Sequence, residues 1–212
     1  MSKKPRTKFI GRHLMLKGTY IEKLLSGEKR ATIRRGIVKP KYDEITIHAG
    51  GRPVAKAKIT RVYYKKLSEL GDYEAKLEGY DSREELIEEL KRVYKGIRDD
   101  EYVTIIEFEV TQRLDMLPPE DPYLGLKPVD IARIALRYLK NELNDLELKI
   151  LIDITRTNSI RKTAIRVLGD LNKRGVVRRV IKKALKMLIE RGLLKVAGSS
   201  TSQAGNNREH SS

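Results

Sequence analysis

The sequence predicts an α+β protein in which a small β-barrel with flanking helices is followed by an all-α domain. The first half carries short segments of alternating polar and apolar residues, the pattern of half-buried strands, with helical segments between them. Three prolines within residues 118–122 cannot lie inside a helix or a central strand, so they separate the two halves. After them the apolar residues recur with the helical period.

Short strands interleaved with two helices favour a small barrel over a parallel sheet with crossover helices. Thr19 is expected to cap the first helix, which ends before Gly27, a residue that readily adopts the left-handed conformation of a helix C-terminus. The second helix, 82–94, begins with a capping signal at Asp81-Ser82 and two glutamates in its first turn. Strands are expected at 13–16, 31–35, 45–47, 54–64 and 102–110, with a Gly-Gly turn at 50–51.

The second half reads as a chain of helices that ends in an unpatterned tail. Helices are expected at about 129–139, 146–156, 159–172 and 177–191, and Gly192 follows the last of them as a C-terminal glycine. The tail is polar and small in composition, so we expect it to be disordered. The predicted domains are a barrel at 1–117, a proline-rich linker at 118–127, a basic helical domain at 128–196 and a disordered tail at 197–212.

The composition excludes several classes of protein. The chain has no cysteine, so disulfides, thiolate nucleophiles and cysteine-based metal sites are ruled out. His13, His48 and His210 are scattered and no pair has ligand spacing, so we predict no metal and no cofactor. No apolar run approaches the ~20 residues that cross a bilayer, and the basic N-terminus lacks the apolar stretch of a secretory signal. We therefore expect a cytoplasmic protein with no membrane partner.

The net charge of +16 is unevenly distributed and points to a polyanionic partner. Residues 1–50 carry a net +9 and residues 151–212 a net +10, whereas residues 101–150 carry a net −4. Two basic regions of this kind are typical of phosphate-facing surfaces. A thermophile-like surface, rich in Lys, Arg and Glu, is the alternative, and it accounts for the 35% of charged residues but not for the excess of bases.

Residues 27–34 read Gly-Glu-Lys-Arg-Ala-Thr-Ile-Arg and contain the pattern Gly-x-Lys-x-x-x-x-Arg. This pattern resembles the signature of the ASCH domain family, relatives of the PUA RNA-binding barrels. The order of the surrounding elements and the Leu-Glu-Gly-Tyr segment at 77–80 also resemble that family, over roughly residues 11–112. The resemblance implies a PUA-like β-barrel and an RNA partner.

The residues of the motif also predict a binding cleft by themselves. Thr32 and Arg34 share one face of the expected strand, and Lys29 enters from the preceding turn. An ammonium, a hydroxyl and a guanidinium in one cleft suit a phosphate or a nucleobase. The nearby tyrosines Tyr63, Tyr64 and Tyr80 serve either as stacking platforms for bases or as barrel packing. The nucleic-acid-binding residues predicted in the barrel are Lys29, Arg30, Thr32, Arg34 and Arg35.

A catalytic function is the alternative for the same cleft. Some small ASCH proteins are similar to amidohydrolases that remove the acyl group from acetylated cytidine with a Lys, a Thr and a Glu. By motif match Lys29 and Thr32 take the first two positions, and Glu78 is the nearest candidate for the third. A lysine of lowered pKa would activate the threonine hydroxyl. The resemblance implies a ribonuclease as a further possibility, in which the Lys/Arg cluster serves phosphodiester cleavage.

Residues 143–196 resemble a winged helix-turn-helix. The resemblance rests on the closing pattern Leu-x-x-Leu-Ile-Glu-x-Gly-Leu-Leu. In the recognition helix, 178–194, four apolar residues face the core and the basic residues lie elsewhere, open to phosphates or base edges. No second strand follows Val196, so the wing is absent or reduced, which weakens the case for sequence-specific DNA binding. The basic residues predicted to bind nucleic acid are Arg178, Arg179, Lys182, Lys183 and Lys186.

Together these features predict an RNA-binding protein that holds a phosphate or a flipped nucleotide in the barrel, with the helical domain adding electrostatic contacts. Two alternatives stay open. One is a hydrolase of acetylcytidine or RNA that acts through Lys29, Thr32 and Glu78. The other is a DNA-binding regulator whose barrel senses a small ligand. The oligomeric state is not predicted.

Overall fold

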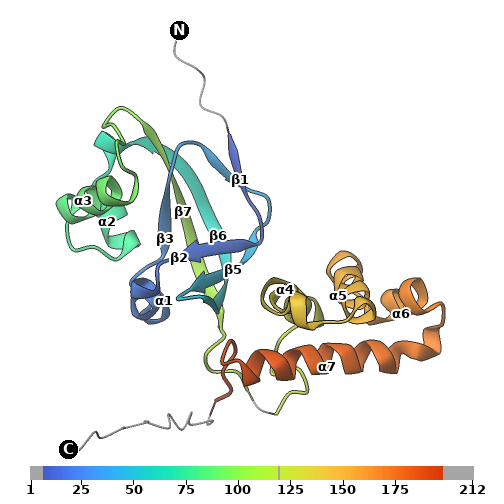
Figure 1. The fold of residues 1–212 in the computed structure, drawn as a ribbon. Helices are drawn as coiled ribbons and strands as arrows, with labels where there is room; N and C mark the ends of the chain where they lie inside the picture. The colour runs from blue at the N-terminus through green and yellow to red at the C-terminus, as the bar shows by residue number, and fades with distance from the viewer. Residues whose placement is uncertain (1–6, 119, 198–212) are drawn as a thin grey trace, which may run out of the picture. The chain divides into compact units, whose positions relative to one another are not determined.

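The computed structural model describes residues 7–118 and 120–197 of the 212-residue chain. The chain divides into two compact units, with the boundary between Asp115 and Met116. The first unit holds all the strands and three α-helices, and the second is helical (Figure 1). The architecture is therefore α+β, as the sequence predicts.

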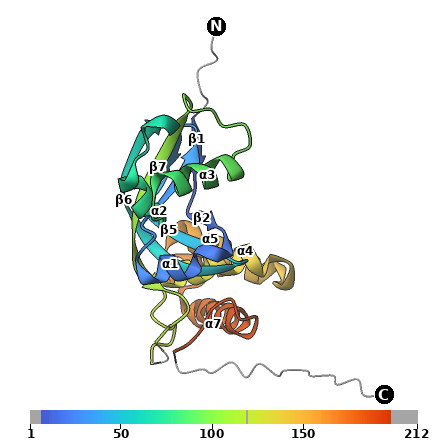
Figure 2. The same ribbon diagram turned by 90° about the vertical axis from the view of Figure 1, so that its left-hand side faces the viewer.

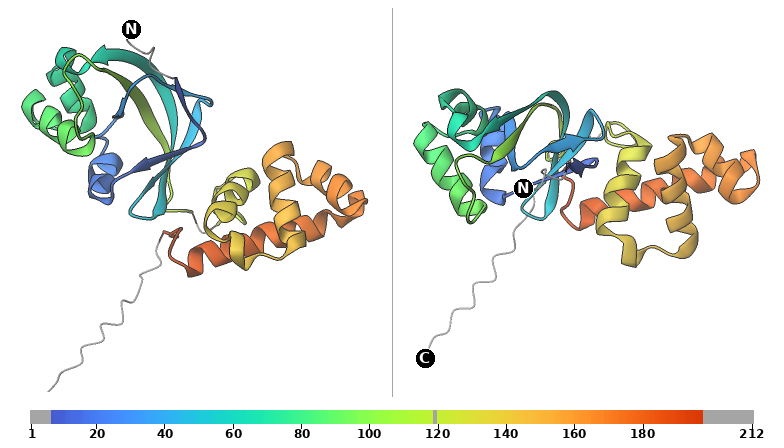
Figure 3. Two further views of the ribbon diagram at one scale, coloured as in Figure 1. Left: turned by 45° about the horizontal axis from the view of Figure 1, so that its top comes forward. Right: turned by 90° about the horizontal axis from the view of Figure 1, so that it is seen from above.

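The first unit is a curled five-stranded half-barrel in the order β2-β5-β6-β7-β3. Its central strands β6 and β7 are long and antiparallel, and two register shifts along their pairing, at Lys56/Ala57 and Ile59/Arg61, fit the curl because bulges increase twist. The two short strands β1 and β4 form a separate parallel pair. Figure 3 shows the curl of the sheet from two directions. The strands are β1 Lys8–Ile10, β2 His13–Leu16, β3 Ala31–Arg35, β4 Val38–Pro40, β5 Glu44–Ala49, β6 Arg52–Lys66 and β7 Tyr102–Arg113.

Three helices complete this unit: α1 Ile21–Ser26, α2 Asp72–Glu78 and α3 Arg83–Val93. Helices α2 and α3 lie together beside the sheet, which Figure 2 shows from their side. Their apolar faces pack on Ala31 and Ile33 of β3 and on the start of β7, forming one buried cluster. A second cluster joins α1 to β2, to β5 and to the first half of β6, where Val54, Ala55 and Ala57 are buried. Strand β3 therefore packs on the helical layer through Ala31 and Ile33.

Most elements of the first unit occur where the sequence predicts them, with three differences. Thr19 does not cap α1: it lies inside a 3₁₀ turn, Gly18–Tyr20, and Tyr20 precedes the helix without a side-chain cap. Helix α2 was not expected, because its N-terminus is a glycine and it spans only seven residues. Strands β1 and β4 were not expected either, since three-residue strands carry too little alternation to detect.

The second unit contains four helices among its described residues (Figures 1 and 3). Helix α7 is the longest, and α4, α5 and α6 all pack against it. Its buried side chains include the four apolar residues Val180, Ala184, Leu185 and Leu188 that the sequence assigns to the core. The helices are α4 Pro128–Tyr138, α5 Asp145–Thr157, α6 Ile160–Leu168 and α7 Arg174–Glu190.

The region after α7 bears on the predicted wing. Within the described residues the only β pairing of this unit is one isolated parallel bridge between Leu117 and Val196. Leu117, the last residue of the predicted barrel, is buried, and so are Leu124 and Leu126 of the predicted linker. The tail predicted to be disordered lies almost wholly outside the described residues.

No described helix combines the length and the apolar character that crossing a membrane requires.

Candidate functional site

The loop between α1 and β3 positions the first residue of the site. Gly27 ends α1 in the left-handed conformation, at φ 84°, and the chain then reverses toward β3. The Lys29 amide donates to the Lys23 carbonyl at 2.8 Å, and the Arg30 amide donates to the Leu77 carbonyl of α2 at 2.7 Å. These bonds tie the motif to both neighbouring helices, so Lys29 enters the protein between them.

Glu78, the last residue of α2, meets Lys29 inside the protein. Its carboxylate forms an ion pair with the Lys29 ammonium and accepts a hydrogen bond from the Ile33 amide at 2.5 Å. The Lys29 ammonium also donates to the Glu78 carbonyl at 3.1 Å. Gly79 follows at φ 87°, and a Cβ there would lie 3.6 Å from the Lys29 Cβ and 3.1 Å from the Lys23 Cδ. The glycine thus allows the close approach that brings Glu78 onto Lys29.

Lys29 is 1% exposed, which is unusual for a lysine. Burial, together with the nearby positive charges of Arg34 and Lys23, lowers its pKa to about 7, and burial is the largest of these causes. The Glu78 carboxylate acts in the opposite direction, because it stabilises the ammonium form. The Tyr20 ring adds a weaker contact of that kind, with its centroid 4.5 Å from the Lys29 nitrogen. Lys29 is therefore a buried amine that can exchange a proton near neutral pH.

The Lys29–Glu78 pair lies at the wall of a cavity of about 100 Å³ between β3, α3 and the start of α1. Tyr20 and Tyr80 close one side, with their hydroxyls 2.5 Å apart. Thr32 is 4% exposed, and its hydroxyl makes no hydrogen bond within the described part of the chain. The residues lining the cavity include Met15, Lys17, Tyr20, Lys29, Thr32, Arg34, Glu78, Tyr80, Glu89 and Tyr94.

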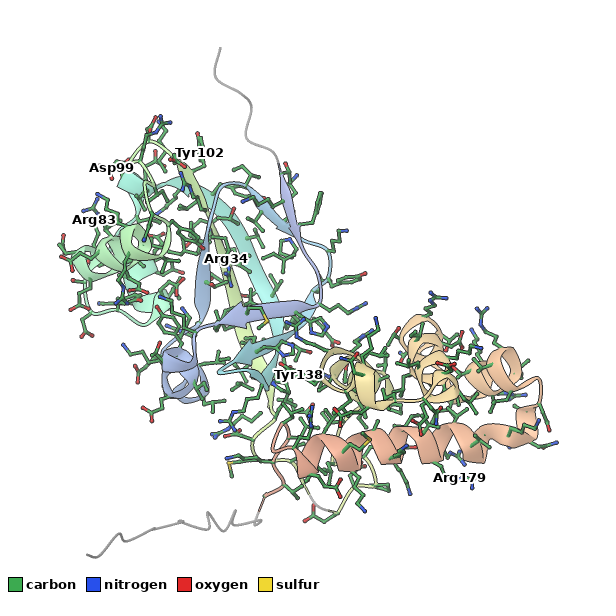
Figure 4. The ribbon with its side chains drawn as sticks, in the orientation of Figure 1. Arg34, Arg83, Asp99, Tyr102, Tyr138 and Arg179 are labelled. Atoms are coloured by element: carbon green, nitrogen blue, oxygen red, sulfur yellow. The ribbon has the colours of Figure 1, made fainter. Side chains whose placement is uncertain are left out.

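Arg34 reaches the same cavity from β3, on the same side as Thr32. One guanidinium nitrogen, Nη2, donates to the Met15 carbonyl at 2.7 Å. Its Nε is buried and has no hydrogen-bond partner among the described residues. Figure 4 shows Arg34 within the curl of the sheet. Because a buried unpaired donor is costly, this nitrogen is a natural contact for a bound acceptor.

The structure therefore brings Lys29, Thr32, Arg34 and Glu78 together and leaves the other predicted barrel residues apart. Arg30 is exposed and does not line the cavity. Arg35 is paired with the Glu101 carboxylate through two hydrogen bonds of 2.8 and 2.9 Å. Neither residue lines the Lys29 cavity, and we propose no RNA contact for Arg30.

Of the three tyrosines considered as stacking platforms, Tyr80 lines the cavity. Tyr63 packs against the α2–α3 cluster and donates to Glu74 at 3.2 Å, so it belongs to the core. Tyr64 is half-exposed and does not line the cavity. Burial raises the pKa of Tyr80, and its bond to Tyr20 adds to that effect, so its hydroxyl stays protonated.

Tyr20 and Glu89 belong to the site but were not predicted from the sequence. Tyr20 is the last residue of the 3₁₀ turn, a short element with no periodicity to detect. Glu89 borders the buried face of α3 that Leu86 and Leu90 define. This position could have indicated a site residue from the sequence, because an acid beside an apolar stripe needs a partner. It pairs with Lys17 at 2.7 Å and with Arg92.

The predicted basic residues of α7 are all exposed. Lys183 is paired with Glu147 of α5 at 2.6 Å, and Lys186 lies 3.6 Å from Glu190. Arg178, Arg179 and Lys182 have no ion pair among the described residues. Figure 4 shows Arg179 projecting from α7 on the side away from α4, α5 and α6. The unpaired cations lie in the N-terminal half of the helix.

The histidines are closer than their spacing in the sequence suggests. Parallel pairing of β2 with β5 places His13 beside His48, and their ring nitrogens lie 2.8 Å apart. In the described part of the chain no group of three His, Asp or Glu residues is arranged to hold a metal ion.

A curled half-barrel with a Lys-Thr-Arg cleft beside its motif strand is a PUA-like fold. The family model of the ASCH domain matches residues 7–112, half of the chain, so the chain belongs to the ASCH domain family. Comparison with curated proteins gave no match.

The solved structures similar to this chain cover about half of it. An ASCH domain from Lactobacillus crispatus JV V101 is 20% identical, covering 50% of this chain and 80% of that one with a TM-score of 0.43. The ASCH protein of Zymomonas mobilis is 17% identical, covering 50% and 71% with a TM-score of 0.39. A protein from Enterococcus faecalis V583 is 20% identical, covering 45% and 69% with a TM-score of 0.39.

Proposed function

We propose that the protein binds single-stranded RNA and takes the base of one unstacked nucleotide into the Lys29 cavity. The observation that carries this proposal is the composition of the cavity: a buried Lys29–Glu78 pair, an unbonded Thr32 hydroxyl and two tyrosines. Sequence-specific readers of RNA stack splayed bases on aromatic rings and bond their polar edges in this way. The PUA-like fold of the ASCH family supports RNA as the partner.

The ion pair changes the role that Lys29 plays in this proposal. Its ammonium is matched by the Glu78 carboxylate, so it offers a polar contact to a base rather than a free charge to a phosphate. Arg34 is the cavity residue placed to meet the backbone, because Lys17 is paired with Glu89. We therefore assign the predicted phosphate contact to Arg34 instead of Lys29.

The helical domain supports the same function through its charge. In α7 no acid occurs before Glu190, and its N-terminal half exposes unpaired cations that include Arg178, Arg179 and Lys182. We propose that this face contacts phosphates without reading the sequence. The winged-helix interpretation, with α5, α6 and α7 as its three helices and no full wing, remains part of this proposal.

The experiment compares two variants that remove the same charge. Arg34→Gln acts inside the cavity, whereas Arg30→Gln removes an exposed charge outside it. Affinity for short single-stranded RNA is measured by fluorescence anisotropy at fixed salt, with duplex RNA and duplex DNA alongside. We expect Arg34→Gln to weaken RNA binding by about tenfold, the loss of one charge-assisted hydrogen bond, and Arg30→Gln to change it little.

Equal affinities for the two variants would reject the cavity as the RNA site. A preference for duplex DNA that Arg34→Gln does not alter would instead support the DNA-binding regulator.

A hydrolase is the second candidate, favoured by the pKa of Lys29 at about 7. In this reaction the neutral Lys29 amine accepts the Thr32 proton while the Thr32 oxygen bonds to the acyl carbon of acetylcytidine. The bond from that carbon to the exocyclic nitrogen then breaks, and the proton passes from Lys29 to the leaving amine. Water hydrolyses the acyl-threonine with Lys29 again as base, releasing acetate, and Glu78 holds the lysine in place.

This candidate predicts a rate that rises with pH through about 7, because only the neutral amine accepts a proton. Chromatography of acetylcytidine incubated with the protein would detect cytidine. Thr32→Val should abolish turnover while Arg30→Gln keeps it. Absence of cytidine with the unmodified protein from pH 6 to 9 would reject the hydrolase.

A further inference from the structure

A second, larger cavity adjoins the Lys29 cavity on the opposite side of Arg34. Its volume is about 440 Å³, and it lies between the β1–β2 segment, β3, β4 and the end of α3. Met15, Arg34 and Tyr94 line both cavities, so the two share a wall. The residues lining the second cavity are Lys8, Phe9, Ile10, Gly11, His13, Leu14, Met15, Arg34, Arg35, Val38 and Tyr94.

The two cavities differ in charge. The Lys29 cavity contains the carboxylates of Glu78 and Glu89. The described residues that line the second cavity include two arginines, a lysine and a histidine, but neither Asp nor Glu. A concave site with basic walls and no acid attracts anions. The second cavity therefore suits a phosphate, whereas the first suits a neutral polar group.

Of these basic residues, Arg34 and Lys8 are the ones available to a ligand. Arg35 is held by Glu101, and His13 is bonded to His48. The Lys8 ammonium has no ion pair with any residue that the structure describes, and its residue is exposed. The Arg34 Nε is buried without a partner. The Arg34 charge thus lies at the shared wall, and the Lys8 charge lies at the mouth of the second cavity.

An aromatic ring lies beside these charges. Phe9 lines the second cavity and is 60% exposed, although it belongs to a strand. Strand β1 pairs only with β4 among the described strands, so the Phe9 ring is open to a ligand. Lys41 covers part of the ring, with its ammonium 5.3 Å from the ring centroid. A ring of this kind beside cations is how proteins hold the bases of single-stranded nucleic acids.

We propose that the second cavity is the subsite for the nucleotide that adjoins the one in the Lys29 cavity. The phosphodiester between the two nucleotides binds the Arg34 guanidinium at the shared wall and is reached by Lys8, and the second base stacks on Phe9. This inference rests on the proposed function and names its minimal ligand, a dinucleotide.

The test compares nucleosides with dinucleotides on the full chain. Dissociation constants are measured by isothermal titration calorimetry for adenosine, cytidine, guanosine and uridine, and for ApA, CpC, GpG and UpU. For the preferred base we expect the dinucleotide to bind at least about tenfold more tightly than the nucleoside, since one stacked base and one phosphate are added.

Two variants assign this gain to the second cavity. Lys8→Gln and Phe9→Ala should each reduce the gain on extension to about twofold or less. Matched controls are Lys39→Gln, an exposed lysine of β4, and Tyr42→Ala, an exposed ring under Arg12, neither of which lines the cavity. Both controls should keep the full gain.

The outcomes separate this inference from the proposed function. A nucleoside that binds without any gain on extension overturns the second subsite and leaves the first cavity as the RNA site. A gain that Lys8→Gln and Phe9→Ala leave intact overturns it as well. Absence of binding by every nucleoside and dinucleotide would reject the proposed function together with the inference.

Discussion

At the scale of single residues, the properties of the site follow from one buried charge. Lys29 has almost no contact with solvent, and its only acidic partner in the described part of the chain is Glu78, which the Ile33 amide holds in place. Burial disfavours the ammonium and the carboxylate favours it, so the two effects compete at one nitrogen. Such a group responds strongly to small changes in its surroundings, which is common at functional sites.

The first prediction concerns the pKa of Lys29. In protein labelled with ¹³C-lysine, the Lys29 side chain should titrate near pH 7, well below the ordinary lysine value of 10.5. Arg34→Gln should raise the Lys29 pKa, because it removes a repelling positive charge. Glu78→Gln should lower it, because it removes the charge that stabilises the ammonium. A Lys29 signal that titrates with the exposed lysines in all three proteins would contradict the assignment.

At the scale of elements, the site depends on turns that place α1, α2 and β3 together. Gly27 and Gly79 both end a helix in the left-handed conformation, and the residues next to them, Glu28-Lys29 and Glu78, form or flank the ion pair. The Gly-x-Lys motif is therefore a structural device as well as a chemical one: the glycine supplies the turn and the lysine enters through it.

The second prediction tests this turn. Gly27→Ala should lower the free energy of unfolding by about 1 kcal/mol, since the left-handed conformation strains any residue with a Cβ. No atom lies within 4 Å of the added Cβ, so the loss reports the backbone alone. Gly11→Ala is the control, because Gly11 also has open space and lacks a positive φ. Urea unfolding followed by circular dichroism measures both, and equal effects would contradict the argument.

Much of the element order could be predicted from the sequence, because the strands alternate and the longer helices are periodic. Strand β3 and the Ser82 cap of α3 occur at the predicted residues. The contacts of the site were harder to predict. Lys29 and Glu78 lie 49 residues apart, so no local pattern links them, and the family resemblance alone suggested the pair. The proximity of His13 and His48 depends on a parallel strand pairing, which periodicity does not reveal.

At the scale of the whole molecule, the uneven charge is the feature to explain. The N-terminal and C-terminal quarters are strongly basic and the middle is not. Within the first unit the unpaired cations that line cavities include Lys8 and Arg34. Within the second unit the exposed cations without an ion pair include Arg178, Arg179 and Lys182 of α7. Each unit therefore carries its own candidate contacts to phosphate, and their contributions to RNA binding can be measured separately.

The third prediction separates these contributions by salt. A triple variant, Arg178→Gln/Arg179→Gln/Lys182→Gln, should weaken RNA binding at low salt. It should also make the slope of log affinity against log salt shallower by about 2, because a variant that makes fewer phosphate contacts releases fewer counterions when it binds. The matched control removes three exposed lysines outside both cavities, Lys39→Gln/Lys58→Gln/Lys76→Gln, and lowers the net charge equally. If both triple variants reduce the slope by the same amount, the effect reports net charge alone and the α7 face makes no specific contact. If only the α7 variant reduces the slope, the helical domain contacts the RNA backbone. If Arg34→Gln still weakens RNA binding when added to the α7 variant, the half-barrel binds the nucleotide independently.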